Sequence, residues 1–184
     1  MKSTQAILKI PYRKLVWLLP IVLALHELEE WNIKHWNAAN FVNSPDTPES
    51  AIRAVLILVI FIGFAITAIS CLFKNPSVTA YISLPFFILV VFNNSISHIY
   101  WQLNWGVYAP GVIAAAFLNI PTILLLSWHA LANKLVSLIF LLTLYVSSIP
   151  SLIFTVKQGR IFPEVMLKVH ELGINLSNIS TTAP

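Results

Sequence analysis

Long apolar stretches, separated by short polar segments, run through the 184-residue chain. A helix that crosses a bilayer needs roughly 20 predominantly apolar residues. By that measure the pattern predicts an all-α, polytopic membrane protein with about five transmembrane helices in one bundle. The predicted spans are 14–36, 51–73, 79–101, 107–130 and 134–156, so residues 1–156 form the transmembrane bundle.

A second periodic segment follows the last span. Its apolar residues recur at helical spacing, with Pro163 near the beginning and Gly173 at the end. This spacing predicts a short amphipathic helix that lies on the membrane surface, followed by a polar tail from Asn175. Residues 157–184 are therefore expected to form an interfacial helix and tail. The residues that carry the pattern are Phe162, Val165, Met166, Val169 and Leu172.

The composition supports a membrane protein. Hydrophobic residues make up 58 % of the chain and charged residues only 10 %, whereas about a quarter of the residues of a soluble domain are charged. The lipid bilayer is thus the expected partner. The net charge of +4 comes from basic residues scattered at the helix ends, so no nucleic-acid partner is expected. The single cysteine, Cys71, excludes an internal disulfide and a thiolate metal site.

The basic residues also predict the orientation. By the positive-inside rule, those before the first span and in two later connections mark the cytoplasmic side, which places the N-terminus there in a multi-pass arrangement. These residues are Lys2, Lys9, Arg13, Lys14, Lys74 and Lys134. A further group, Lys157, Arg160 and Lys168, follows the last span. It argues either against a fifth span or for a C-terminal segment held at the interface.

The main polar motif ends the first apolar run, where His26, Glu29 and Glu30 occur together. A charged side chain in the bilayer is unfavourable by on the order of 3 kcal/mol, so such residues usually face a bundle interior and have partners. Residues three and four apart share a helix face, so these three side chains can converge while Glu27 points elsewhere.

The third predicted span carries a second polar pair, Asn94 and His98, four residues apart on one face. At about 1.5 Å per residue, Glu30 lies ~24 Å along the first span and this pair lies ~21–27 Å along the third. Because both spans run outward, the two groups are predicted to meet in the outer half of the bilayer. Arg53 is expected either to pair with Glu29 or Glu30 or to extend to the headgroups. Asn94 and Arg53 are accordingly the candidate cofactor-binding residues.

Two imidazoles with carboxylates suit Zn²⁺, Fe²⁺ or Mn²⁺. The predicted metal ligands are His26, Glu29, Glu30 and His98, of which Glu29, Glu30 and His98 are also the candidate catalytic residues. Two alternatives stay open. One is a metal-free acid–base site, in which His98 works with one of the crowded carboxylates. The other is a buried polar network that only holds the first three spans in register.

His26-x-x-Glu29-Glu30, the Asn94–His98 pair and the later Tyr108-x-Pro110-Gly111 together resemble the bacterial integral membrane proteins named for the HXXEE motif. The resemblance covers the first four predicted spans. It implies a membrane protein of the bacterial inner membrane and an important site at His26, Glu29, Glu30, Asn94 and His98. It implies no reaction, because that family is functionally uncharacterised. Di-iron bundles and intramembrane proteases with paired glutamates are less similar, because their later ligand motifs are not reproduced here.

The leading hypothesis for the function is a metal-dependent membrane enzyme, a hydrolase or isomerase, acting on a lipid-soluble or lipid-anchored substrate. A non-enzymatic proton or cation transporter is the first alternative, since intramembrane carboxylates and histidines mark such paths. A membrane protein whose polar cluster is only structural, such as an assembly or immunity partner, is the second.

Overall fold

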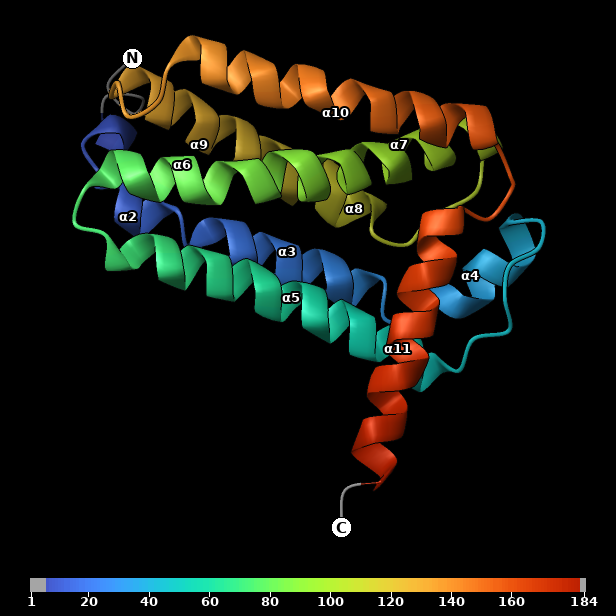
Figure 1. Cartoon of the computed structure of the whole chain (residues 1–184). Coiled ribbons are helices and arrows are strands. Elements are labelled where there is room, and N and C mark those ends of the chain that lie inside the picture. The colour runs from blue at the N-terminus through green and yellow to red at the C-terminus, as the bar shows by residue number, and fades with distance from the viewer. Residues whose placement is uncertain (1–5, 183–184) are drawn as a thin grey trace.

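The computed structural model describes residues 6–182, without the side chains of Val165 and of residues 179–182. Over this range the chain is a helical bundle without a β-sheet (Figure 1), so the predicted all-α fold class is confirmed. Lys2 and the last two residues of the predicted polar tail lie outside the described residues. The elements are α2 (Tyr12–Leu15), α3 (Leu18–Glu29), α4 (Ile33–Asn40), α5 (Glu49–Leu72), α6 (Pro76–Phe86), η1 (Phe87–Phe92), α7 (Asn93–Trp105), α8 (Val112–Ala114), η2 (Ala115–Asn119), α9 (Ile120–Ala132), α10 (Leu138–Gln158) and α11 (Glu164–Thr182).

Within residues 6–182, four helical stretches are long and apolar enough to cross a membrane: Glu49–Leu72, Pro76–Trp105, Val112–Ala132 and Leu138–Gln158. They correspond to the second to fifth predicted spans. The predicted first span is instead divided among α2, α3 and α4. Helix α3 has 12 residues and is therefore about 18 Å long, against a hydrocarbon core of about 30 Å. The predicted count of five spans is thus not confirmed.

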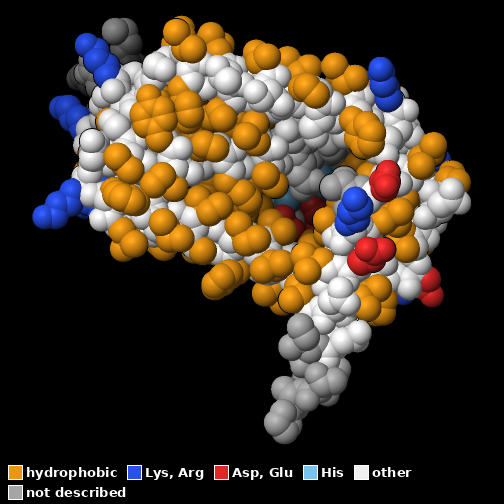
Figure 2. Space-filling model, viewed as in Figure 1, with side chains coloured by type: hydrophobic (Ala, Val, Ile, Leu, Met, Phe, Trp, Pro, Cys, Tyr) orange, Lys and Arg blue, Asp and Glu red, His pale blue; other side chains and the backbone are white. Residues whose placement is uncertain are grey.

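The surface is arranged as a lipid-exposed protein requires. In Figure 2, hydrophobic side chains cover the flank of the bundle, and Lys and Arg side chains gather at the end where Figure 1 places the N-terminus. Acidic side chains are visible toward the opposite end, near α11, together with a few Lys and Arg side chains, and also inside a hollow beside α11. An apolar band between polar ends is the pattern expected of a protein surrounded by lipid.

Two π-helical turns interrupt the bundle, and each is close to a proline. Segment η1 begins two residues after Pro85, and η2 ends two residues before Pro121. Proline has no backbone N–H and frees the carbonyl four residues earlier, which a locally widened helix can accommodate. π-Helical turns recur at functional sites, and η1 leads directly into α7, the helix that carries Asn94 and His98.

The end of the bundle that holds the polar residues is covered by α4 and α11. Helix α11 crosses α5 closely at Gly173, where a Cβ atom would overlap the carbonyl oxygen of Ala51. Phe41 directly follows α4, and its ring contacts aromatic rings of α4, of α7 and of the segment before α11. These rings belong to Trp36, Trp101, Trp105 and Phe162. The predicted C-terminal helix is present within α11 and packs on the bundle over the polar site. It does not end at Gly173, because α11 continues through the predicted polar tail to Thr182.

Candidate functional site

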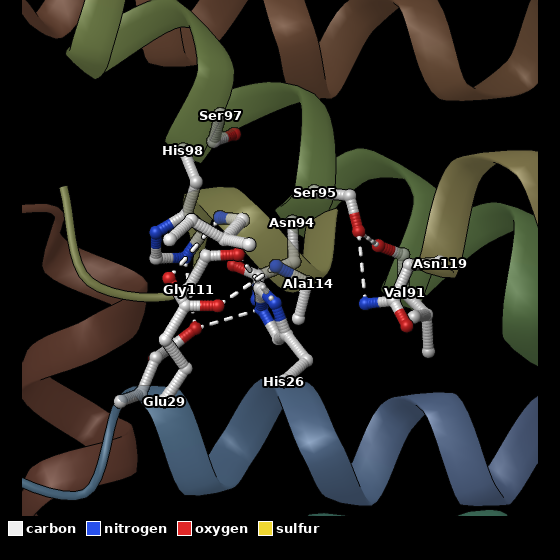
Figure 3. Close-up of polar contacts among 12 residues, drawn as sticks. His26, Glu29, Val91, Asn94, Ser95, Ser97, His98, Gly111, Ala114 and Asn119 are labelled. Carbon is white, nitrogen blue, oxygen red and sulfur yellow. Dashed lines mark hydrogen bonds and ion pairs between the residues drawn. The ribbon is translucent and has the colours of Figure 1, made fainter. Parts of the chain in front are cut away.

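His26 of α3, Glu30 at the end of α3 and His98 of α7 bring their side chains to one point. The distance from Oε1 of Glu30 is 2.7 Å to Nε2 of His26 and 2.9 Å to Nε2 of His98. The two imidazole rings meet edge to face, with their centroids 5.0 Å apart. All three residues are buried, with exposed fractions of 0 %, 7 % and 1 % respectively. We call these three residues the His–Glu cluster; Figure 3 shows how its histidines approach from different helices.

Hydrogen bonding fixes which nitrogen of His26 carries hydrogen. Its Nδ1 lies 2.9 Å from the carbonyl oxygen of Gly111, and because a carbonyl can only accept, Nδ1 is the donor. In neutral His26, Nε2 then keeps a lone pair directed into the cluster. The amide nitrogen of Asn94 lies 3.0 Å from this Nε2 and can donate to it. A backbone carbonyl that holds the second nitrogen is the usual arrangement of a metal-binding histidine.

In the His–Glu cluster, two hydrogen-bond acceptors lie closer together than two acceptors can when nothing lies between them. Nε2 of neutral His26 and Oε1 of Glu30 are both acceptors, yet they lie 2.7 Å apart. Such a separation requires either a proton or a cation between them. The candidate ligand atoms of His26, Glu30 and His98 all lie within 4.8 Å of one another. Ligand atoms at ~2.0–2.2 Å from a tetrahedral zinc ion would be about 3.3–3.6 Å apart, so the 2.7 and 2.9 Å separations here would have to open by roughly half an ångström to admit the ion. Three protein ligands with a free fourth position are typical of catalytic zinc.

Glu29 has a different role from its neighbour. Its carboxylate accepts hydrogen bonds from the backbone N–H of Ile113 (3.1 Å) and of Ala114 (2.7 Å), and from the hydroxyl of Tyr108 (2.5 Å). These backbone donors belong to the first turn of α8, where a carboxylate is favourable. Glu29 thus ties α8 to α3 and so holds the Gly111 carbonyl near His26.

Gly111 is required at this point of the site for two reasons. Its φ of +89° lies in the left-handed region that favours glycine. A Cβ atom here would also lie 2.8 Å from Oε1 of Glu30 and 2.8 Å from Cε1 of His26. The backbone of Gly111 is therefore packed directly against the cluster.

The cluster adjoins a cavity of about 70 Å³, to which Glu30 and His98 contribute. Most of its other lining residues are apolar, and they include Ile52 and Leu56 of α5 and Met166 of α11. Figure 2 shows a hollow between the bundle and α11, with acidic and histidine side chains at its floor and hydrophobic side chains around it. The site is therefore reached through an apolar surface.

Residues 17–126, more than half of the chain, match a family described as "Protein of unknown function with HXXEE motif". The chain belongs to the HXXEE family. Neither a curated protein nor a solved structure matches it. The resemblance to the HXXEE family inferred from the sequence is thereby confirmed, and the family description assigns no reaction to the site.

In this HXXEE protein, the first and last residues of the motif, His26 and Glu30, contribute to the cluster. Glu27, at the first of the two variable positions of the motif, is buried, with 4 % of its surface exposed, but it does not belong to the group of candidate metal ligands found among the described residues. Glu29 likewise stands outside that group. Of the four predicted metal ligands, the structure brings His26, Glu30 and His98 together.

The two predicted cofactor-binding residues are placed differently. Asn94 reaches His26 and lines the cavity. Arg53 pairs with Glu49 at 2.8 Å and donates to the side chain of Asn32 at 2.9 Å, and its guanidinium lies 5.3 Å from the ring centre of Trp31. The structure therefore gives Arg53 a partner on its own helix and does not bring it to the cluster.

Two supports of the site were not assigned this role from the sequence. The Gly111 carbonyl orients His26, and Asn119 of η2 donates to the hydroxyl of Ser95 on α7 at 3.1 Å (Figure 3). A glycine after Tyr-x-Pro indicates a turn with positive φ, but the sequence does not show that the carbonyl of this glycine bonds to His26. Asn119 is a lone buried amide in an apolar span, which signals a partner without naming it.

Proposed function

We propose that the protein is a metal-dependent membrane enzyme in which His26, Glu30 and His98 bind one divalent ion, Zn²⁺, Fe²⁺ or Mn²⁺. The observation that carries the proposal is the convergence of three buried potential ligand atoms while the second nitrogen of His26 is held by a carbonyl. Two imidazoles and one carboxylate match the preferences of these ions. A metal at this point would polarise a substrate oxygen or activate water, the chemistry of a hydrolase or isomerase.

The residues around the cluster have separate expected roles. Asn94, whose amide lies beside Nε2 of His26 and in the cavity wall, would orient either the ligand or the substrate. Glu29 would act by positioning α8 and Gly111. Of the three residues predicted to be catalytic, Glu30 and His98 line the cavity and keep that role in this proposal, whereas Glu29 is proposed only to position α8.

A lipid-soluble or lipid-anchored substrate fits the surroundings of the site. The cavity walls are mainly apolar, and the hollow that leads to the site has a hydrophobic rim (Figure 2). A water-soluble, charged substrate would find few partners there. We also propose a bacterial inner-membrane location with a cytoplasmic N-terminus, because Lys9, Arg13 and Lys14 mark that end of the chain.

The test is metal analysis by plasma mass spectrometry of protein purified in detergent without chelators. We expect about one equivalent of zinc, iron or manganese, lost in His26→Ala and His98→Ala. His129→Ala is the matched control, since His129 is equally buried but bonds to the carbonyl of Ile10 away from the cluster. Its metal content should equal that of the parent protein.

A parent protein without metal after supplementation would overturn the proposal and favour a structural network or proton transfer. Metal that persists in the His26→Ala and His98→Ala variants would place the ion elsewhere and overturn it as well. Size-exclusion profiles of all four proteins show whether each variant is folded, so that loss of metal is separated from loss of structure.

A further inference from the structure

A groove of about 250 Å³ runs along the bundle beside the cavity at the cluster. Segments η1 and α7 form one side of this groove, and Ser151, Phe154 and Thr155 of α10 form the other. Pro163 and Met166, at the beginning of α11, lie at one end. Its size is near the lower end of the ~300–1,000 Å³ range of small-molecule pockets. The groove is therefore large enough to hold part of an extended ligand.

The groove and the cavity share a wall. Asn94, Trp101, Pro163 and Met166 line both spaces. Asn94 also places its amide nitrogen 3.0 Å from Nε2 of His26. A molecule in the groove is therefore separated from the His–Glu cluster by a single layer of side chains.

The lining of the groove selects for an uncharged ligand. None of its lining residues carries a charge, while Leu89, Val90 and Phe154 provide apolar surface. A carboxylate or phosphate would thus lose its hydration without gaining a cationic partner, which is strongly unfavourable. The chemistry of the walls fits a neutral, mainly apolar molecule.

Two polar atoms in the groove lack a hydrogen-bond partner. Oδ1 of Asn93 and Oε1 of Gln158 are buried and accept no hydrogen bond from any described residue. The amide nitrogen of Asn93 is already used, because it donates to the carbonyl of Leu89 at 2.9 Å. Buried acceptors are nearly always paired in native proteins. Each atom can therefore accept a further hydrogen bond, which an O–H or N–H of a bound molecule would supply if the side chain turned toward the groove.

We propose that the groove between α7 and α10 binds a neutral lipid, whose apolar chain lies along η1 and α10 and whose hydroxyl or amide N–H donates to Oδ1 of Asn93 or to Oε1 of Gln158. The inference rests on the proposed function only in taking this lipid to be the substrate of the cluster. Movement of Met166 or Trp101, which lie in the shared wall, would bring the polar end of the lipid to the cluster.

The experiment uses the full chain in lipid nanodiscs and a long-chain alcohol that carries a photoreactive diazirine. Crosslinked peptides are located by mass spectrometry, and hexadecanol, palmitate and hexadecane compete with the probe. Ser151→Trp fills the groove, and Asn93→Leu removes one acceptor while keeping a similar side-chain volume. Ser147→Trp is the matched control, because Ser147 is also an exposed serine of α10, one turn earlier and outside the groove.

We expect the probe to label α7 and α10 and hexadecanol to compete well, with palmitate and hexadecane much weaker. Ser151→Trp should abolish labelling and Asn93→Leu should weaken binding about five-fold, the loss of one neutral hydrogen bond, while Ser147→Trp binds as the parent does. Equal labelling of the two tryptophan variants would overturn the proposal, because it would indicate ordinary surrounding lipid. If palmitate competed as well as hexadecanol, the claim that the ligand is uncharged would be overturned. If hexadecane competed as well, the claim that the ligand donates a hydrogen bond would be overturned.

Metal content measured on the same samples separates this proposal from the proposed function. If the Ser151→Trp variant keeps its metal but no longer binds the probe, the variant is folded and the result supports lipid binding in the groove. Specific labelling of a metal-free parent would refute the metal enzyme and leave the lipid site standing. A parent protein that contains metal but shows no specific labelling would refute the lipid site and leave the metal enzyme standing.

Discussion

Replacing Gly111 by alanine tests whether the α8 turn holds the cluster together. A non-glycine residue in the left-handed region is destabilised by roughly 1–2 kcal/mol. The new Cβ would also lie 2.8 Å from Oε1 of Glu30, where ordinary contact begins at 3.4 Å, so the carboxylate must move by about 0.6 Å. Metal ligand distances tolerate only about 0.2 Å. We therefore expect Gly111→Ala to weaken zinc binding at least ~10-fold.

Gly106→Ala supplies the matched control. Gly106 also has a positive φ, +67°, but a Cβ atom there meets nothing within 4 Å. Gly106→Ala should lose the stability that the backbone conformation alone costs, and Gly111→Ala at least as much, measured from their thermal unfolding midpoints in detergent. Zinc affinity, measured by competition with a chelating dye, should fall only in Gly111→Ala. Equal affinities of the two variants would refute the reasoning, because they would show that the Gly111 turn is not coupled to the ligands.

Three further changes test the surroundings of the cluster. Glu29→Gln weakens the cap on α8, so we expect a loss of about 1 kcal/mol in stability with metal retained, whereas Glu30→Gln should lose the metal; equal metal content in both would contradict these separate roles. Gly173→Leu forces α11 away from Ala51, so hydrogen exchange should become faster in α11 and remain slow in α3; unchanged exchange in α11 would argue against the close crossing. Burial lowers the pKa of His170 below its ordinary value, so the unfolded state takes up a proton first and stability should fall as the pH drops below about 6.5. Thermal unfolding at several pH values should show that His170→Phe loses this part of the slope, and an identical slope in both proteins would contradict it.

Much of the cluster follows from local geometry. His26 and Glu30 are four residues apart, as are Asn94 and His98, so each pair shares a helix face whatever surrounds it. The similar depths of the two pairs along their helices predicted that they would meet, and His26, Glu30 and His98 do meet. The sequence could not decide between Glu29 and Glu30, since positions three and four residues after His26 both lie on its face.

The length of the apolar runs determined the class of the protein, because a bilayer imposes about 20 apolar residues on each spanning helix. Four helices of that kind are present among residues 6–182. The first run was the exception, because it ends as α3 after 12 residues. Hydropathy counts apolar residues without registering where the backbone leaves the helix, so it could not show this division.

Only the tertiary structure decided which side chains act together. The N-terminus of α8, 84 residues further along the chain, takes up Glu29 and leaves Glu30 to the histidines. Arg53 pairs with Glu49 on its own helix and not with the carboxylate of Glu29 or Glu30. The Gly111 carbonyl that orients His26 is 85 residues away in sequence. Periodicity describes one helix at a time, whereas these choices depend on which partners neighbouring helices bring within hydrogen-bonding distance.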